Sequence, residues 1–357
     1  MKKMTVLLIL TLLLTGCSDV KEKVETQTEN EVSTTDSLDD SFYRVVKFDT
    51  NLRRDNYYTS FGQTSDFQTI GRELQILSTE YFSTDDYYMS DGQYLKNDDM
   101  NKLLKRSDNP KEYPYTLQVQ KGQTIGGVLN PIMVSTVHEQ DYYIKDGDKY
   151  ELKGMSLAIV LDPRNENNSR LTTSMDYEIV EDYGRESISK LYEYVQTKKT
   201  LKDIPINICV YYATNTNEST INGRYILKSY CENGVGNIEN LDYKNYMFSS
   251  EEASVADEET ASQFEIFKSN MKKASLEAVG VIGYGRYKDG TIQSMNIDLN
   301  VNVKTYEELI YLVSTAADEV DAQFTGFDIK VLVYSQDKLE AIIIKDKGEK
   351  AKSHLLY

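Results

Sequence analysis

The C-terminal part of the chain alternates between two kinds of apolar pattern in a fixed order, and this order restricts the fold more than any other feature. Lys288-Asp289-Gly290 is a turn signal between two alternating segments, which predicts a hairpin. Thr305 precedes a segment with apolar residues three or four positions apart, which predicts a capped helix. The expected elements are strands at 279–287 and 292–303, a helix at 306–322, and strands at 329–334 and 339–344.

The same order of elements is predicted once before in the chain. The expected elements there are strands at 155–161 and 172–180, a helix at 181–198, and strands at 204–212 and 224–231. We interpret the two runs as two related strand-strand-helix-strand-strand units. Alternating strands with one polar face favour antiparallel sheets packed against helices. The predicted fold class is therefore α+β.

An acidic segment lies between the two units. Residues 249–263 hold five acids and no base, which predicts a solvated linker. This linker would divide an N-terminal α+β region at 41–248 from a C-terminal α+β region at 264–357. The other expected elements of the N-terminal region are a helix capped by Asp66, a helix at 97–106, and either a helix or a strand at 129–143.

Residues 1–16 have the pattern of an export signal. Two lysines precede the apolar run Val6–Leu14, which is too short for a bilayer span of about 20 apolar residues. Leu14-Thr15-Gly16-Cys17 resembles the lipobox of bacterial lipoproteins, in which the chain is cut before a cysteine that receives a diacylglyceryl group. We therefore predict cleavage between Gly16 and Cys17, and a lipid on Cys17 that anchors the protein at the extracytoplasmic face of the cell membrane.

The charge of the chain restricts its partners. Residues 17–40 are acidic and lack aromatic side chains, which predicts a disordered tether. The formal net charge of −17 argues against nucleic acid and against anionic lipid as partners of the folded part. The expected partners are the membrane through the lipid on Cys17, the lipoprotein-processing enzymes, and the cell wall. The 28 tyrosines fit stacking on wall sugars, but the base composition of an AT-rich genome explains them more simply.

Side chains suited to catalysis or metal binding are few in this sequence. His138 and His354 are its two histidines, so a metal site of His and Cys ligands is not expected. A Ser-His-Asp arrangement is not expected either, because no Gly-x-Ser-x-Gly turn is present. Weak candidates for calcium ligands are the loop acids Asp85, Asp86, Asp91, Asp146 and Asp148. We predict no catalytic residue, no metal and no cofactor.

Cys209 and Cys231 fall in two segments predicted to form one hairpin. A turn centred near Ser219 or Thr220 would set the two cysteines opposite each other, and an exported location permits their oxidation. The pattern therefore allows a disulfide between Cys209 and Cys231. Two buried free thiols are the alternative.

Several motifs together resemble one known family. They are the lipobox, the acidic tether, Asp91-Gly92-Gln93-Tyr94-Leu95, Leu129-Asn130-Pro131, and His138-Glu139-Gln140-Asp141-Tyr142-Tyr143. In these motifs the chain is similar to the CamS-type sex pheromone precursor lipoproteins of low-GC Gram-positive bacteria. The resemblance extends to the run from Gly154 to Val210 and would cover nearly the whole chain.

The resemblance implies two products. A short hydrophobic peptide from the end of the released leader acts as a conjugation pheromone, and the matching segment here is Leu10, Thr11, Leu12, Leu13, Leu14, Thr15 and Gly16. The mature part is then expected to be a non-catalytic binding or scaffold module outside the cytoplasm. The alternative is a cell-wall or peptide-modifying enzyme of an unrecognised type. A cleft that holds clustered acids or His138 would favour the enzyme.

Overall fold

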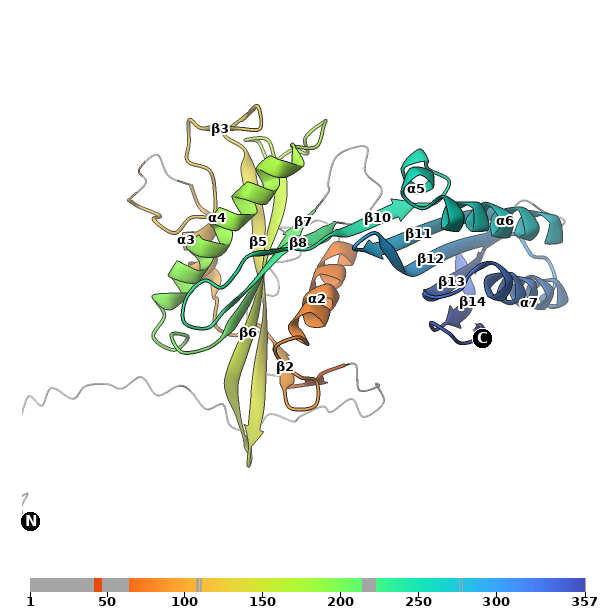
Figure 1. Cartoon of the computed structure of the whole chain (residues 1–357), viewed down its shortest axis with the longest axis horizontal. Helices are drawn as coiled ribbons and strands as arrows, with labels where there is room; N and C mark the ends of the chain where they lie inside the picture. Colours follow the sequence, from red (N-terminus) through yellow and green to blue (C-terminus); the bar gives the residue numbers. More distant parts are fainter. Residues whose placement is uncertain are drawn as a thin grey trace, which may run out of the picture.

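The computed structural model describes residues 42–46, 64–106, 109, 111–213, 223–275, 277 and 279–356. These residues form two lobes, each built on one large β-sheet (Figure 1). The predicted signal peptide, cleavage site and tether lie outside the described residues. Within the described ranges, no helix is long and apolar enough to cross a membrane.

The N-terminal lobe contains a seven-stranded mixed sheet in the order β1-β2-β5-β6-β7-β8-β9. Its strands are β1 (Arg44–Val45), β2 (Tyr88–Asp91), β5 (Ile132–Asp146), β6 (Lys149–Arg164), β7 (Ile206–Tyr212), β8 (Arg224–Cys231) and β9 (Glu239–Asn240). The helix α4 (Tyr177–Gln196) connects β6 to β7, and these two strands pair in parallel, as a helical crossover requires. A separate small hairpin pairs β3 (Thr124–Ile125) with β4 (Val128–Leu129).

Helices cover both faces of this sheet (Figure 1). On one face, α4 packs through residues such as Ile188 and Leu191, and α3 (Asn97–Leu104) lies on the same side. On the other face, α2 (Thr64–Ser78) packs through Ile70 and Leu74. Because both faces are covered, every residue of β7 is buried and the strand shows no polar alternation.

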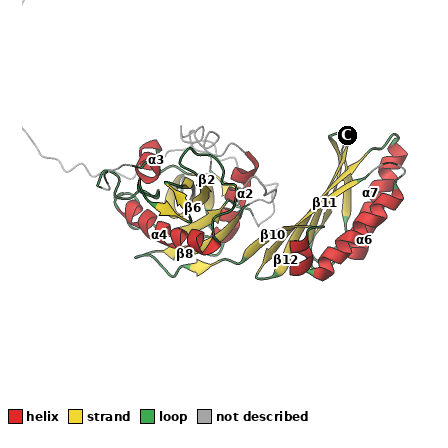
Figure 2. Ribbon diagram, turned by 90° about the horizontal axis from the view of Figure 1, so that it is seen from above, coloured by secondary structure: helices red, strands yellow, loops and turns green. Residues whose placement is uncertain are grey.

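The C-terminal lobe contains a six-stranded sheet in the order β10-β11-β12-β13-β14-β15. Its strands are β10 (Tyr243–Met247), β11 (Gly280–Lys288), β12 (Thr291–Val301), β13 (Asp328–Ser335), β14 (Lys338–Lys345) and β15 (Lys352–Leu355). Two helices, α6 (Glu258–Ala274) and α7 (Tyr306–Gln323), lie along one face of this sheet (Figure 2). On the other face, alternate residues of β13 are exposed or half-buried, so this face of the strand remains open.

The predicted α+β class is confirmed, and both sheets are mixed rather than purely antiparallel. The connection through α7 makes β12 and β13 parallel, as the connection through α4 does for β6 and β7. The runs β5-β6-α4-β7-β8 and β11-β12-α7-β13-β14 have the same element order and the same pairing. Thr305 is the N-cap of α7, and its side chain accepts a hydrogen bond from the Glu308 amide.

The prediction of a strand at 172–180 is wrong. The antiparallel partner of β6 is β5, which occupies the segment that fitted a helix or a strand equally well. The helix α4 begins at Tyr177, because the Asp176 side chain caps it by accepting a hydrogen bond from the Glu178 amide.

The prediction of a solvated linker at 249–263 is also wrong. This segment contains α5 (Glu251–Ala256) and the start of α6, and Ala253 and Ala261 are buried. Its acids lie in the first turns of these two helices, where negative charge is favourable. The connection between the two sheets is residues 241–242, because β9 is the last strand of the first sheet and β10 is the first strand of the second.

Candidate functional site

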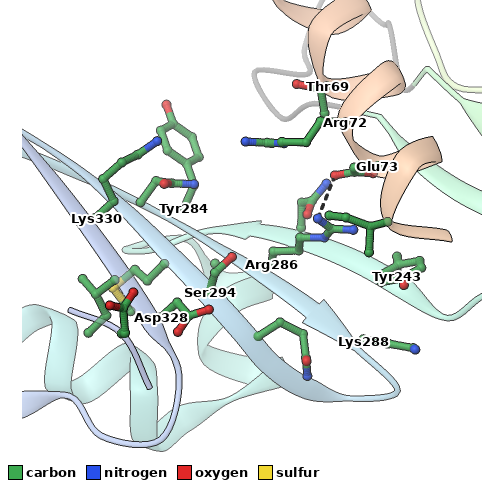
Figure 3. A pocket seen from close by; sticks show the side chains of 18 of the residues that line it. Thr69, Arg72, Glu73, Tyr243, Tyr284, Arg286, Lys288, Ser294, Asp328 and Lys330 are labelled. Carbon is green, nitrogen blue, oxygen red and sulfur yellow. Dashed lines mark ion pairs between the residues drawn. The ribbon is translucent and has the colours of Figure 1, made fainter. Parts of the chain in front are cut away.

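A cleft of about 890 Å³ lies between the two lobes (Figure 3). The helix α2 forms one wall, and β10 to β14 of the C-terminal sheet form the floor and the opposite wall. The residues that line it include those of α2 (Arg72, Glu73), β10 (Tyr243), β11 (Tyr284, Arg286, Lys288), β12 (Ser294, Asn296), β13 (Asp328, Lys330) and β14 (Ile344, Lys345). The cleft therefore depends on how the two lobes are placed.

An ion pair crosses the cleft and joins the lobes. The Arg286 guanidinium on β11 lies 3.1 Å from the Glu73 carboxylate on α2. The same guanidinium lies 4.9 Å from the centre of the Tyr243 ring, within the range of a cation–π contact. Burial raises the pKa of Glu73 above its ordinary value, although Arg286 and Arg72 act in the opposite direction. The Glu73 carboxylate therefore binds Arg286 across the interface between the lobes.

The cleft is locally cationic in a strongly acidic protein. Its lining residues include five Lys or Arg and three Asp or Glu, whereas the whole chain carries −17. Arg286 is paired with Glu73, and the ammonium of Lys345 lies 2.9 Å from Asp321 on α7. Within the described part of the chain, no carboxylate forms an ion pair with the other three cations, which are Arg72, Lys288 and Lys330. An anionic ligand would find positive charge available here.

The floor of the cleft combines polar and apolar side chains in register. Tyr284 on β11 lies opposite Asn296 on β12, which lies opposite Lys330 on β13. Lys330 in turn lies opposite Ile344 on β14, whose side chain is 40% exposed although it is apolar. Figure 3 shows Arg72 on α2 extending toward the part of the cleft where Tyr284 and Lys330 rise from the sheet. Side chains that approach each other here come from both lobes.

Two of the motifs that resemble the family, residues 91–95 and 138–143, meet in the N-terminal lobe, away from this cleft. The fully buried Glu139 accepts hydrogen bonds from the Tyr94 and Leu95 amides at 2.8 and 2.9 Å. Asp141, also fully buried, accepts one from the Gln93 amide at 2.8 Å. Gly92 is required beside them, because a Cβ there would lie 2.6 Å from the Glu139 side chain. These two carboxylates therefore fix the loop that follows β2.

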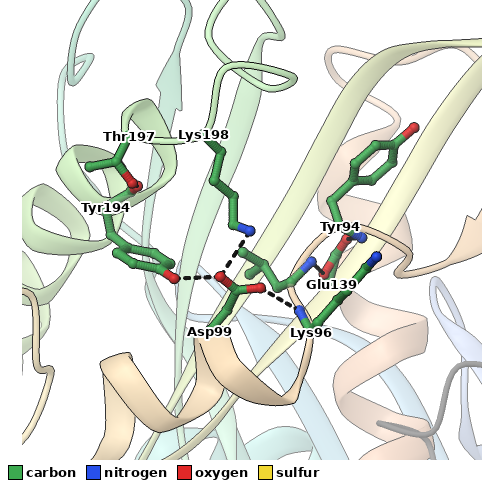
Figure 4. A network of polar contacts seen from close by, with 8 residues as sticks. Tyr94, Lys96, Asp99, Glu139, Tyr194, Thr197 and Lys198 are labelled. Atoms are coloured by element: carbon green, nitrogen blue, oxygen red, sulfur yellow. Dashed lines mark hydrogen bonds and ion pairs between the residues drawn. The ribbon is translucent and has the colours of Figure 1, made fainter. Parts of the chain in front are cut away.

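A second polar network lies next to this loop (Figure 4). The Asp99 carboxylate accepts hydrogen bonds from the Tyr194 hydroxyl and, at 2.7 Å, from the Lys96 amide. It also forms an ion pair with the Lys198 ammonium at 2.8 Å. Burial would raise the pKa of Asp99, but these hydrogen bonds outweigh burial and lower it. The network ties the start of α3 to the end of α4.

The remaining predicted site residues are dispersed. His138 is buried under α2, with its ring 4.8 Å from that of Phe67, and His354 is exposed on β15. Asp91 accepts a hydrogen bond from the following Gly92 amide. Asp85 and Asp86 lie in the turn before β2, whereas Asp146 ends β5 and Asp148 lies in the turn that follows it. In the described ranges, no group of three or more His, Cys, Asp or Glu side chains is arranged to hold a metal ion.

The prediction that Cys209 and Cys231 face each other is wrong, and both are buried free thiols. In the hairpin of β7 and β8, Cys209 lies opposite Lys228, and Cys231 lies opposite Ile206. Ile206 is three residues from Cys209, so the two thiols point to opposite faces of the sheet. Cys209 packs on the α2 side and Cys231 on the α4 side. A disulfide between them is therefore excluded by the register.

The cleft residues were not singled out from the sequence. The alternation in β13 was a usable signal, because Asp328 and Lys330 occupy the face opposite the buried Ile329 and Val331. No sequence pattern related that face to Arg72 and Glu73 on α2. Their proximity follows from the placement of the two lobes.

Comparisons with known proteins give a consistent result. The model of the CamS sex pheromone cAM373 precursor family matches residues 48–351. The crystal structure of a sex pheromone precursor from Lactobacillus salivarius subsp. salivarius UCC118 is similar, with a TM-score of 0.79, 21% identity, and coverage of 93% of this chain and 99% of that one. The C-terminal domain of the sex pheromone staph-cAM373 precursor from Staphylococcus aureus is also similar, with a TM-score of 0.68, 20% identity, and coverage of 84% and 98%. A search among curated proteins found no match.

Proposed function

This chain belongs to the CamS sex pheromone cAM373 precursor family, and from this premise we propose that it is an exported lipoprotein with two products. The first product is a short peptide from the leader. The second is the mature protein, held by lipid on Cys17 at the extracytoplasmic face of the cell membrane. The folded part acts as a non-catalytic binding module whose ligand occupies the cleft between the lobes.

The anchor is tested by Cys17→Ala. Signal peptidase of the lipoprotein pathway acts on a lipidated cysteine, so the variant should remain an uncut precursor or escape into the medium. Membrane fractionation and mass spectrometry of the chain measure both outcomes. Unchanged size and unchanged membrane retention would contradict the proposal.

The peptide product is tested with the leader segment itself. A synthetic peptide of Leu10 to Gly16, Leu-Thr-Leu-Leu-Leu-Thr-Gly, should induce mating aggregation in cells that carry a responsive plasmid. A scrambled peptide of the same composition serves as the control. If no fragment of the leader produces a response, the pheromone role is removed and the anchored lipoprotein remains.

The binding role is supported by one observation above all: residues of both lobes build a cationic cleft around the Glu73–Arg286 ion pair. Of the side chains that would have favoured an enzyme, Glu139 and Asp141 hold backbone amides, His138 packs under α2, and Glu73 in the cleft is paired with Arg286. When peptidoglycan fragments and short peptides are incubated with the purified mature chain carrying Cys17→Ala, mass spectrometry should detect no change in their masses. Products formed in excess over the protein would establish the enzyme instead.

A further inference from the structure

We propose that the cleft binds the free carboxylate end of a short apolar peptide, with Arg72 and Lys330 on opposite walls holding the carboxylate. The inference rests on the binding role proposed above and names the class of ligand. Both side chains are exposed, and they come from different lobes. Figure 3 shows them directed toward the same part of the cleft.

The charged side chains of the cleft favour a ligand with a single negative charge at one end. Arg72 and Lys330 form no ion pair with a carboxylate of the described chain, whereas Glu73 is occupied by Arg286. A guanidinium presents paired N–H donors that match the two oxygens of a carboxylate. Farther along the open face, beyond the residues that line the cleft, Asp298 on β12 lies opposite Ile282 and Leu332 and interacts electrostatically with Lys330. A second negative charge on the ligand would be repelled there, so a single terminal carboxylate fits best.

The rest of the floor suits apolar side chains on a peptide backbone. Beyond Tyr284 and Ile344, the open face continues through a row that contains Ile282, Leu332 and Ile342. Ile282 is 41% exposed and Ile344 is 40% exposed, although both are apolar. Ser294 and Asn296 on the same face provide hydroxyl and amide groups for peptide N–H and C=O groups. A fatty acid would use the apolar row but would leave these polar groups without a partner.

The size of the cleft and the sequence of the leader agree with this ligand. A volume of about 890 Å³ lies within the range of clefts that bind small ligands. The leader segment Leu10 to Gly16 has no charged side chain, and cleavage before Cys17 would leave a free carboxylate on Gly16. This peptide, released beside the anchored protein, has the chemistry that the cleft selects.

The test compares two synthetic peptides of the sequence Leu-Thr-Leu-Leu-Leu-Thr-Gly, both acetylated at the N-terminus. One ends in a carboxylate and the other in an amide, so the single charge is the only difference. Calorimetry with the mature chain carrying Cys17→Ala should detect binding of the acid, and at least tenfold weaker binding of the amide, because a charge-assisted hydrogen bond is lost. Decanoate and inorganic phosphate serve as non-peptide anions and should bind more weakly than the peptide acid.

Three variants locate the carboxylate. Arg72→Ala and Lys330→Ala should each weaken binding of the acid about tenfold or more and leave binding of the amide unchanged. Lys272→Ala, which removes an exposed charge from α6 on the covered side of the sheet, should change neither. Equal affinity for acid and amide, absence of binding, or stronger binding of decanoate or phosphate would each overturn the inference. None of these outcomes changes the fractionation or turnover results, so failure of the ligand class is distinguishable from failure of the proposed function.

Discussion

The two lobes use the same strand-strand-helix-strand-strand order but cover their sheets differently. In the N-terminal lobe, α2 and α4 cover both faces, so β7 is buried throughout. In the C-terminal lobe, α6 and α7 cover one face, and β13 alternates between buried and accessible residues. The open face of the second sheet becomes the floor of the cleft, and the back of α2 becomes its wall. An uncovered sheet face thus provides a binding surface that the doubly covered lobe cannot offer.

The largest effect is expected for Glu139→Ala, which tests whether the N-terminal lobe depends on its buried carboxylates. Two amides lose their acceptor and a cavity is left, so the free energy of unfolding should fall by about 3–5 kcal/mol. Urea unfolding measures the loss, and hydrogen exchange should show it in this lobe and not at α6 and α7. The control is Glu151→Ala on β6, which removes an exposed acid and should change stability by less than about 0.5 kcal/mol. Equal losses for both variants would contradict the structural role of Glu139.

A smaller effect is expected from two glycines that lie on opposite faces of β11. A Cβ at Gly283 would lie 2.3 Å from the Phe264 ring, so Gly283→Ala should overpack the covered face and lower the free energy of unfolding by about 1–3 kcal/mol. Gly280 lies on the open face, where a Cβ would meet the Asn300 side chain at 3.5 Å. Gly280→Ala should therefore be nearly neutral or slightly stabilising. If the two variants unfold at the same urea concentration, the assignment of covered and open faces is wrong.

The lobe interface should respond to pH through Glu73. Its pKa is raised mainly by burial, so the folded state holds the proton more firmly than the unfolded state does. The contribution of Glu73 to stability is therefore most favourable below the unfolded pKa of about 4.3 and declines as the pH rises through the folded pKa. Glu73→Gln should remove this decline, and Arg286→Ala, which leaves the carboxylate unpaired, should steepen it and cost about 1 kcal/mol at neutral pH. Urea unfolding at a series of pH values measures the difference, and parallel curves for all three proteins would refute the prediction.

The smallest effect concerns the two thiols of the doubly covered sheet. Burial raises the pKa of the Cys209 thiol to about 12, and it raises the pKa of Cys231 as well. In mature chain carrying Cys17→Ala, neither thiol should react with a thiol reagent at pH 8 while the protein is folded. Both should react after unfolding, with the same count in the presence and absence of reductant. Fewer thiols without reductant would reveal a disulfide and contradict the register of β7 and β8.

Local patterns were sufficient for the C-terminal unit. The turn at Asp289-Gly290 has positive φ angles of 51° and 73°, which is the conformation that this residue pair favours. Thr305 caps α7, and the alternation of β13 marks its buried face. Such features depend on neighbouring residues and on one covered face, so they can be recognised without knowledge of the tertiary structure.

Three features depended on residues that are distant in the sequence, and only the tertiary structure decided them. Continuous burial removed the alternation from β5, so its sequence did not distinguish a strand from a helix. The register of β7 and β8 separated two cysteines whose spacing had suggested a pair, because a shift of an odd number of residues reverses the face. The cleft joins α2 to a sheet from the other end of the chain, and only the packing of two lobes brings Arg72 and Lys330 to the same space. The sequence determined the hairpins, the helix and the buried faces of the C-terminal unit, whereas the site arose from long-range packing, which no local periodicity records.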